Sequence, residues 1–464
     1  MIHRTIHAHT NSDTALMTEG SIVKSILFFS IPLILGNFLQ QMYNTVDSII
    51  VGNYVGSGAL AAVGSSASLI FLIIAFSQGL SVGSGVIVAQ YLGAGDKRGV
   101  NLAVHTALAI SVLVGLLMTV GGIVFTRPLL VWMDTPESIM PEAVEYLKLY
   151  CGGMLFGTIY NMAAGIMNAA GNSKRSLIYL GVAAVTNIVL DVVLIVWLKM
   201  GVAGAAWATN ISQLVSAILA MAFLMRTSAD YKVDLKHLVI RRKMAGRIIA
   251  IGLPTGIQNM VISLSNVLIQ ASINVFGASA IAGFGAFLKV DGFNVLPILS
   301  LSMAITTFVG QNYGANRMDR VNKGVYITIA MGMAYTIVAS VLMLIYSEPI
   351  MRMFSQEKDV IACGQLAMWY FCPFYWVLSI LHTLGGTMRG FGKSIPPMVI
   401  LLIAMCLFRI VWLQTILPHF PSTDCIFVLY PVSWVLGAVM MAWYTKQTGL
   451  LRQKDTSAIL CQAA

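Results

Sequence analysis

The stretch Ala-Gln-Tyr-Leu-Gly-Ala at residues 89–94 recurs 221 residues later as Gly-Gln-Asn-Tyr-Gly-Ala at residues 310–315. Three separate segments share this offset, which indicates an internal duplication of the chain. The two further segments align Gly165, Met167, Gly171 and Ser173 with Gly386, Met388, Gly392 and Ser394, and Gly56, Ala59, Ala61 and Gly64 with Gly277, Ala280, Ala282 and Gly285.

The composition around this repeat excludes an ordinary soluble enzyme and a disordered chain. Of the 464 residues, 58% are hydrophobic and 10% are charged, whereas an average soluble domain carries about 25% charged residues. A membrane-spanning helix needs about 20 mostly apolar residues, and the chain holds twelve such runs. They lie near residues 26–50, 64–90, 102–125, 147–170, 176–198, 202–225, 249–275, 285–310, 324–346, 364–388, 396–417 and 426–445.

Each copy of the repeat holds six spans, and six spans return the chain to the side of the membrane where it began. The two copies are therefore parallel repeats. We predict an all-α polytopic membrane protein with twelve transmembrane helices in two parallel six-helix repeats around a central cavity. This architecture is typical of carriers that give alternating access by rocking one lobe against the other.

The net charge of +10 is distributed unevenly along the chain. With a cytoplasmic N-terminus, 21 of the 28 Lys and Arg residues fall in inside segments and five fall outside. Because basic residues favour the cytoplasmic side, we predict a multi-pass membrane protein with both termini in the cytoplasm. The basic charge is then an orientation signal, and nucleic acid is excluded as a partner.

The spans divide the chain into lobes, tails and one linker. The linker stands out because it alone holds seven Lys and Arg residues. No apolar segment in the first 20 residues has the character of a signal peptide, and we expect a monomer. The predicted parts are an N-terminal tail at 1–20, an N-terminal lobe at 21–225, a basic linker at 226–247, a C-terminal lobe at 248–446 and a tail at 447–464.

Polar side chains form a stripe along one face of the first span and of the seventh. The spacings of three, four and seven residues place the members of each stripe on one helical face. Hydrogen bonding between helices is the simpler explanation, but matching stripes in repeated spans favour a shared substrate cavity. The stripes comprise Asn37, Gln40, Asn44 and Asp47 on the first span, and Asn259, Ser263, Asn266, Gln270 and Asn274 on the seventh.

A second polar group lies on the fifth and sixth spans. Asn187 and Asp191 are four residues apart, and Thr209 and Asn210 follow on the next span. Together with Asp47 they offer hard oxygen donors of the kind that Na⁺ prefers. Two carboxylates in a low-dielectric pocket can instead share a proton, so the coupling ion is either Na⁺ or H⁺. A purely structural buried Asp191 is the remaining interpretation.

Three other charges fall within spans, where each is a functional hypothesis by default. Arg409 lies in the middle of the eleventh span, and we assign it to the polar lining of the cavity. Lys289 and Asp291 begin the eighth predicted span and either pair with each other or have a separate role. The proline residues Pro32, Pro254 and Pro297 interrupt spans, where they permit kinks or hinges.

The chain shows no sign of enzymatic chemistry. Its six Cys residues have no CxxC spacing, so we predict no disulfide, no transition-metal site and no cofactor other than the coupling ion. Residues 390–394, Gly-Phe-Gly-Lys-Ser, end like a phosphate-binding loop. The first glycine of that loop is replaced by Thr387, and the segment follows a span rather than a strand. We therefore predict a protein that does not hydrolyse ATP and is not an enzyme.

These residues together resemble the multidrug and toxic compound extrusion (MATE) transporters, in particular the bacterial branch related to the DinF and MepA exporters. The resemblance covers the chain from about Ser21 to Thr448. The motifs that carry it are Ile31-Pro32, Asp47 and Val51-Gly52 on the first span, residues 90–94 and 310–315, Gly165, Met167 and Gly171, and residues 386–392.

The resemblance implies a secondary antiporter that exports amphipathic, mainly cationic drugs or metabolites in exchange for Na⁺ or H⁺. It also implies a cation site in the N-terminal lobe, at the positions held here by Asp47, Asn187, Asp191 and Thr209. Two other carriers remain as alternatives. One is a major-facilitator transporter, and the other is a lipid-linked oligosaccharide flippase of the same superfamily, which would be expected to use several Arg and Lys residues for phosphate.

Overall fold

The computed structural model describes residues 14–451 and is built from helices. In this part of the chain, eleven helices are long and apolar enough to cross a membrane. The fourth predicted span is the twelfth crossing, but it consists of two shorter helices, α4 (Met140–Gly152) and α5 (Met154–Ala169). The prediction of an all-α membrane protein is confirmed. The outer parts of the predicted tails, at 1–13 and 452–464, lie outside the described residues.

The N-terminal lobe extends from the first to the sixth span. A π-helical segment continues its fifth span, and several helices extend beyond the predicted apolar runs. Besides α4 and α5, its elements are α1 (Ile22–Tyr54), α2 (Ser57–Ala94), α3 (Lys97–Trp132), α6 (Ser173–Asp191), the π-helical segment Val192–Trp197 and α7 (Gly201–Arg226).

The C-terminal lobe follows a linker that contains one short turn of 3₁₀ helix at Leu235–His237. Its tenth and eleventh spans are each built from more than one helical segment. The elements are α8 (Arg242–Ile273), α9 (Ala278–Gly314), α10 (Met318–Ile345), α11 (Ser347–Arg352), α12 (Lys358–Phe371), the 3₁₀ turn Cys372–Phe374, α13 (Tyr375–Gly390), α14 (Ile395–Leu402), the π-helical segment Ile403–Leu407, α15 (Phe408–Thr415) and α16 (Thr423–Gln447).

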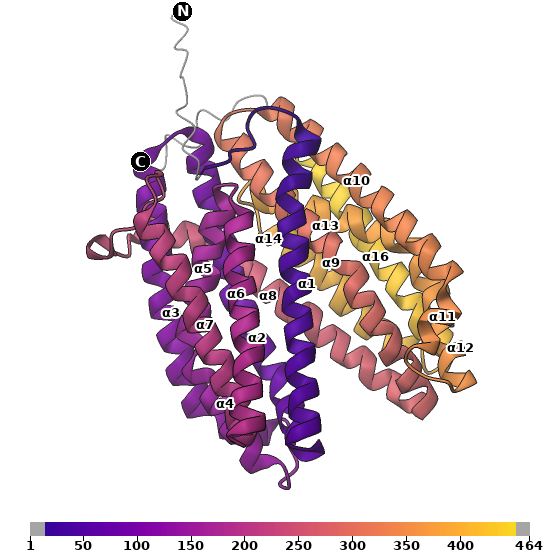
Figure 1. The fold of residues 1–464 in the computed structure, drawn as a ribbon. Coiled ribbons are helices and arrows are strands. Elements are labelled where there is room, and N and C mark those ends of the chain that lie inside the picture. Colours follow the sequence, from indigo (N-terminus) through magenta and orange to yellow (C-terminus); the bar gives the residue numbers. More distant parts are fainter. Residues whose placement is uncertain (1–13, 452–464) are drawn as a thin grey trace, which may run out of the picture.

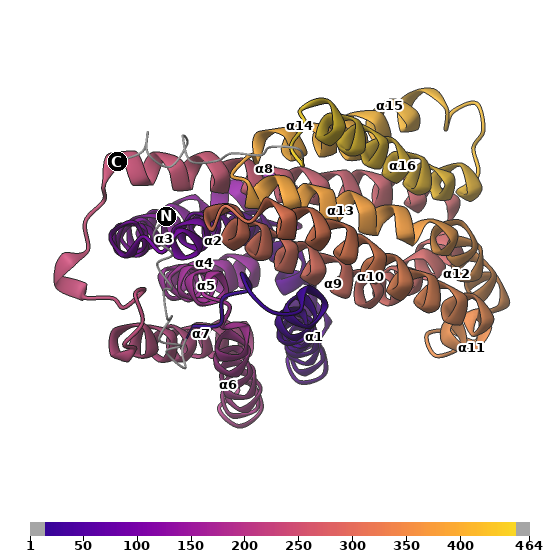
Figure 2. The ribbon, with the colours of Figure 1, turned by 90° about the horizontal axis from the view of Figure 1, so that it is seen from above.

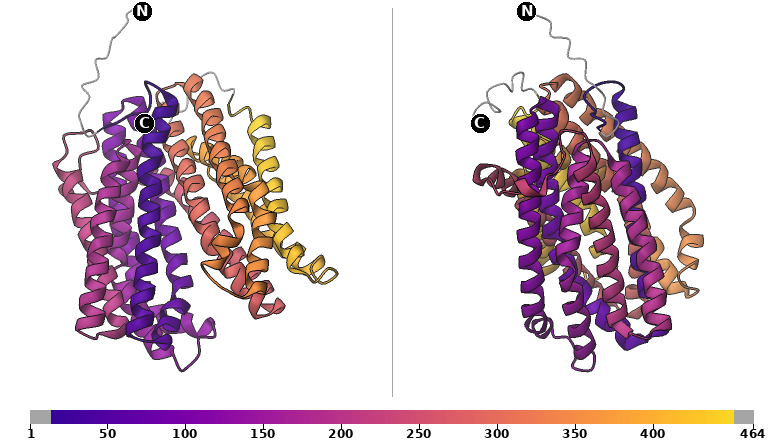
Figure 3. Two further views of the ribbon diagram at one scale, coloured as in Figure 1. Left: turned by 45° about the vertical axis from the view of Figure 1, so that its right-hand side comes forward. Right: turned by 60° about the vertical axis from the view of Figure 1, so that its left-hand side comes forward.

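The two lobes meet at one end and diverge toward the other, as Figures 1 and 3 show. In Figure 1 the helices α2–α7 lie on the left and α9–α16 on the right, with α1 between them. Seen from above in Figure 2, α8 extends from one lobe into the other. We call the end where the lobes meet the basic end, since it carries the linker and the turns after α2 and α9. The other end is called the far end.

Hydrogen bonds confirm the duplication in three dimensions. In the N-terminal lobe Ser81 Oγ donates to the carbonyl oxygen of Asn161 at 2.5 Å. In the C-terminal lobe Ser302 Oγ donates to the carbonyl oxygen of His382 at 2.7 Å. Both partners in the second bond lie 221 residues after those in the first. The two lobes therefore repeat the contact between their second and fourth spans.

The fourth and tenth spans break at equivalent positions by different means. The fourth breaks at Gly152-Gly153, and the same offset leads to Pro373 and Phe374, where the tenth span forms its 3₁₀ turn. Two glycines lower helix propensity, whereas proline lacks the N–H that continues an α-helix. The break is therefore a feature of the repeat, although its residues are not conserved between the two copies.

Small residues allow α2 of one lobe to touch α8 of the other backbone to backbone. A Cβ added to Gly79 would lie 2.5 Å from the carbonyl oxygen of Gly252, and one added to Gly83 would lie 2.4 Å from that of Ile248. Gly79 and Gly83 are four residues apart, as are Gly252 and Gly256. Such pairs of small residues let membrane helices approach closely, and here they join the lobes.

The basic end is closed by a pair of contacts related by the repeat. Gln90 Nε2 donates to the carbonyl oxygen of Gly390 at 3.0 Å, and Gln311 Nε2 donates to that of Ala169 at 2.7 Å. Each bond crosses from one lobe to the other. A Cβ on Gly93 would lie only 1.9 Å from the carbonyl oxygen of Gln311. The residues that revealed the duplication thus form the seam between its two copies.

Candidate functional site

The predicted cation-site residues of α1 and α6 include three buried groups with unsatisfied polar atoms. Asp191 is completely buried, and neither of its carboxylate oxygens has a hydrogen-bond partner within the described residues. Asn187 lies one turn earlier on α6, and neither its amide nitrogen nor its amide oxygen has a hydrogen-bond partner within the described residues. The same is true of Oδ1 of Asp47, whose side chain is half-buried. Most buried polar groups in native proteins have partners. A concentration of unsatisfied oxygens is therefore the expected character of an ion or proton site.

The two carboxylates belong to one electrostatic cluster. Asp47 lies close enough to Asp191 for the two charges to repel each other. Tyr146 of α4 lies within electrostatic range of both carboxylates, and its side chain is buried. The predicted fourth span began at residue 147 and so left Tyr146 outside it. Since α4 begins at Met140, Tyr146 instead lies inside this helix.

Asp191 lies where α6 changes from an α-helix to a π-helix. The α-helix ends at Asp191, and the following residues form a π-helical segment, in which Leu198 N–H donates to the carbonyl oxygen of Val193. Short π-helical stretches are frequent at functional sites, because the wider turn alters the direction of neighbouring side chains. No signal in the sequence predicted this change of helix type.

The two candidates on α7 have different environments. Thr209 is buried, in accordance with a place inside the lobe. Asn210 Nδ2 donates to the carbonyl oxygen of Leu149 at 2.6 Å. The break after α4 frees this carbonyl, since the N–H of Gly153 bonds to Tyr150 instead. Asn210 therefore caps the broken helix through Nδ2, while its Oδ1 has no hydrogen-bond partner within the described residues. Its predicted place in the lining of the substrate cavity stays a prediction.

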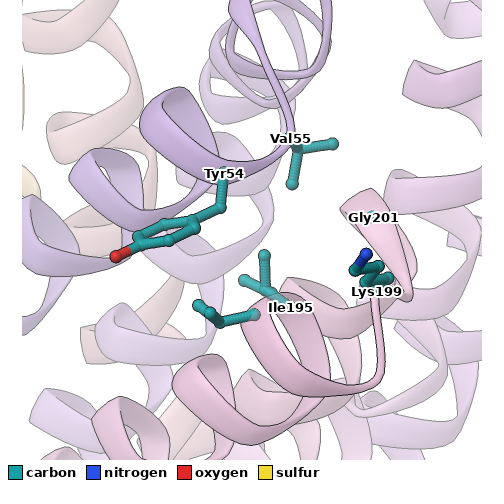
Figure 4. Close-up of a pocket in the computed structure, with 6 residues that line it drawn as sticks. Tyr54, Val55, Ile195, Lys199 and Gly201 are labelled. Atoms are coloured by element: carbon teal, nitrogen blue, oxygen red, sulfur yellow. The ribbon is translucent and has the colours of Figure 1, made fainter.

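A pocket of about 330 Å³ lies on the far-end side of the two carboxylates. Figure 4 shows its lining, which comes from the end of α1 and from the segment between α6 and α7. Tyr54 is seven residues beyond Asp47, and Ile195 is four beyond Asp191. At the α-helical rise of 1.5 Å per residue, Tyr54 lies about 10 Å farther along the axis of α1 than Asp47. The lining residues are Tyr54, Val55, Ile195, Val196, Lys199 and Gly201.

The polar stripe of α1 is only partly free. Asn37 Nδ2 donates to Ser300 Oγ of α9 at 3.1 Å, so it joins the two lobes. The simpler interpretation, hydrogen bonding between helices, therefore applies to Asn37 in this conformation. Gln40 is half-buried, whereas Asn44 is exposed. Asn44 thus remains available to a substrate, although it lies on the same face as the cation site.

One residue of the polar stripe on α8, Asn266, contacts the buried side chain of Arg409. Asn266 is exposed, and its Oδ1 accepts a hydrogen bond of 3.3 Å from Nη1 of Arg409. Arg409 is 2% exposed, donates through Nε to Ser433 Oγ at 3.0 Å, and lies 4.5 Å above the ring of Tyr430. No carboxylate pairs with it among residues 14–451. Asn259, Ser263 and Gln270 are half-buried on the same helix.

The possible ion pair between Lys289 and Asp291 is not formed. The carboxylate of Asp291 accepts a hydrogen bond from the hydroxyl of Tyr375, while Lys289 is exposed. The predicted span began at residue 285, but α9 begins seven residues earlier, at Ala278. Residues two apart on a helix point in different directions, and so Lys289 and Asp291 face different surroundings well inside the helix.

The three predicted hinge prolines all lie inside helices. Pro32 is in α1, Pro254 in α8 and Pro297 in α9. Pro254 lies between Gly252 and Gly256 in the close contact with α2, so a change of its helix would move the junction between lobes. The hinge role of these residues stays a prediction.

Comparison with known proteins identifies the family. A family model described as MatE matches residues 32–193 and 254–413, one segment in each lobe. The probable multidrug resistance protein YpnP of Bacillus subtilis is 30% identical over 398 residues, which cover 84% of this chain and 88% of the relative. The probable multidrug resistance protein YoeA of the same organism is 27% identical over 440 residues, with 93% and 95% covered.

A solved outward-facing structure of a multidrug resistance MATE family transporter of the MOP superfamily has the same fold. Its TM-score is 0.86 at 23% identity, with 93% of this chain and 97% of that chain covered. Together with the family match, this places the chain among the multi-pass membrane transporters of bacteria. The chain belongs to the MatE family, and the major-facilitator alternative is therefore wrong.

Proposed function

We propose that this transporter is a secondary antiporter, which exports amphipathic cations in exchange for Na⁺ or H⁺ across the cytoplasmic membrane. The observation that carries the proposal is the group of unpartnered oxygens on Asp47, Asn187 and Asp191. Thr209 would supply a further oxygen from α7. We assign the basic end to the cytoplasm, because 21 of the 28 Lys and Arg residues lie on that side of the predicted topology.

Coupling requires that the ion and the substrate bind differently to the two states of the transporter. With Asp47 and Asp191 ionised and empty, their charges attract a cation and repel each other. Binding of Na⁺ or a proton removes this repulsion and lets α1 and α6 pack differently. A cationic substrate held by the same charges is then released at the far end, which we place outside the cell.

The test is transport by purified protein in lipid vesicles with separately imposed Na⁺ and pH gradients. Ethidium serves as the fluorescent cation. We expect one of the two gradients to drive its movement, and Asp47→Asn to reduce that movement to the level of empty vesicles. Asp359→Asn, the same change at an exposed residue of α12, is the matched control. Full gradient-driven ethidium transport by the Asp47→Asn variant would contradict the proposed role of Asp47 in ion coupling.

A second candidate is a flippase for lipids that carry phosphate. Arg409 favours it, because a buried guanidinium without a carboxylate partner could hold an anion. Lys289 is the other cation within the spans and is exposed, so the several basic groups expected for phosphate are not gathered in one place. A fluorescent polyprenyl phosphate in the same vesicles separates the two functions. Its movement between leaflets, with no ethidium transport, would favour the flippase.

A further inference from the structure

The segment before the first span lies across the junction of the two lobes at the basic end. We call residues 14–21 the strap. In Figure 1 it is the indigo segment that leads across the top of the molecule to α1. At its centre is Met17, whose side chain is 4% exposed and belongs to the core of the C-terminal lobe. The adjacent Leu16 is 38% exposed, so the strap is anchored by one side chain.

The strap is bound to the C-terminal lobe through its backbone. The N–H of Met17 donates to Gln311 Oε1 at 2.7 Å, and its carbonyl oxygen accepts from Asn312 Nδ2 at 3.2 Å. Arg320 of α10, itself buried, donates to the carbonyl oxygens of Met17, Glu19 and Gly20 at 2.9–3.1 Å. Bonds from a charged donor are stronger than neutral ones. One guanidinium thus binds three carbonyl oxygens within residues 17–20 of the strap.

The same strap is bound to the N-terminal lobe. The N–H of Ala15 donates to the carbonyl oxygen of Ala170, just after α5, at 3.0 Å. Gly171 follows with φ +81°, and a Cβ there would lie 1.8 Å from the carbonyl oxygen of Ala15. Gln311 connects the two attachments, because its Nε2 bonds to Ala169 of the N-terminal lobe while its Oε1 holds Met17.

This arrangement breaks the symmetry of the duplication. Gln90 and Gln311 make equivalent bonds between lobes, but only Gln311 also receives the strap. The segment at the equivalent offset in the second half is residues 235–242, in the linker. It lies against α3, where Thr106 Oγ1 donates to the carbonyl oxygen of Val239 at 3.3 Å. The strap is therefore an addition to the seam and is not demanded by the repeat.

We propose that the strap is a latch that stabilises the conformation closed at the basic end and must leave its place before that end opens. The proposal rests on the alternating-access transport proposed above. Opening the basic end separates Ala170 from Gln311, and one short segment cannot remain bonded to both. The strap therefore biases the resting transporter toward the state that is open at the far end.

The test measures hydrogen–deuterium exchange of the full chain in lipid nanodiscs. The variants are Met17→Ser, which removes the buried anchor, and Arg320→Gln, which removes the guanidinium. We expect exchange in the seam, at residues 86–94 and 308–315, to become faster by about tenfold, as for the loss of a bond to a charged group. Exchange at the far end, at residues 44–54 and 270–277, should become slower because that end closes.

Two matched controls use neighbouring exposed residues. Leu16→Ser changes the adjacent side chain of the strap, and Arg317→Gln removes the same charge three residues earlier, where the side chain pairs only with Asp319. Neither should alter exchange at either end. If Arg320→Gln is too unstable to purify, Met17→Ser and its control carry the test alone.

The outcomes separate the latch from transport itself. Unchanged exchange in the seam, or faster exchange at both ends together, would overturn the latch, because the first shows no effect and the second shows loosening without a change of state. The exchange measurement requires no substrate. If the protein does not transport ethidium, but the strap variants show faster exchange in the seam and slower exchange at the far end, the latch is supported and the proposed substrate is wrong. If ethidium is transported, but the strap variants show neither change in exchange, the proposed substrate is supported and the latch is wrong.

Discussion

At the scale of single residues, polar groups inside the membrane divide into those with partners and those without. Asn37, Asn210 and Arg409 bond to named acceptors in other helices. Asn187 and Asp191 do not. We predicted from the sequence that all five belong to functional sites. The sequence of a span does not show whether a neighbouring helix supplies a hydrogen-bond partner for a polar residue. The residues without partners are the stronger functional candidates.

Asp191→Asn should make the protein more stable while it abolishes coupling. The carboxylate is completely buried without a hydrogen bond, and an uncompensated buried charge costs free energy. Replacing it with a neutral amide of the same shape should raise the free energy of unfolding by about 1–3 kcal/mol. Thermal unfolding in detergent without Na⁺, at a pH where the carboxylate is ionised, measures this. A lower melting temperature would mean that Asp191 is a structural group.

Asn210→Ala should have the opposite effect on stability. The substitution leaves the carbonyl oxygen of Leu149 without its donor at the break after α4. A buried acceptor that loses its partner costs about 1–3 kcal/mol. We expect a lower melting temperature and retention of the ion dependence of transport in the protein that remains folded. Loss of ion dependence with unchanged stability would return Asn210 to the cavity lining.

At the scale of helices, the contact between α2 and α8 depends on glycine. Gly83→Ala would bring a methyl group to 2.4 Å from the carbonyl oxygen of Ile248, and overpacking of this kind costs about 1–3 kcal/mol. Gly64→Ala on the same helix meets nothing within 4 Å and is the control. We expect Gly83→Ala to lower the melting temperature and Gly64→Ala to leave it unchanged or raise it, since glycine weakens a helix. Equal effects would refute the packing argument.

The sequence predicted which helices exist better than it predicted how they are interrupted. Hydrophobic runs and the 221-residue offset give twelve crossings in two copies, because lipid demands a long apolar helix for each crossing. The break at Gly152-Gly153 and the π-helical segments after Asp191 and before Arg409 were not predicted. The glycine pair is a local signal for the first break, but the donor to the freed carbonyl of Leu149 is Asn210, from a distant part of the chain. No local pattern that we recognised predicted the π-helical segments.

For the candidate site, the sequence predicted features local to one helix but not contacts between helices. The spacing of Asn187 and Asp191 put them on one face of a helix, and both are buried with unpartnered polar atoms, which agrees with a shared surrounding. The proximity of Asp47 to Asp191 requires the packing of α1 against α6, which the spacing does not give. The family resemblance supplied it, and the electrostatic interaction of the two residues agrees. Tyr146 was missed because the start of α4 was placed seven residues too late.

At the scale of the whole molecule, contacts between the lobes are concentrated toward the basic end. They include the two glutamine bonds, the close approach of Gly93 to Gln311, and the strap. The glycine contact between α2 and α8 and the bond from Asn37 to Ser300 also join the lobes. The ribbons diverge toward the far end, where the pocket of Figure 4 lies in the N-terminal lobe. The functional interpretation of this difference between the basic end and the far end depends on which side of the membrane each end faces.

Cysteine labelling in intact cells tests that assignment. Lys236→Cys lies in the linker and Lys358→Cys at the start of α12, and both positions are exposed. With the basic end in the cytoplasm, a membrane-impermeant maleimide should label Lys358→Cys at once and Lys236→Cys only after permeabilisation. Cys461→Ser in both chains removes a cysteine of the predicted inside tail. The reverse pattern would place the 21 basic residues outside, against the rule that basic loops stay in the cytoplasm, and the latch would then close the outer entrance.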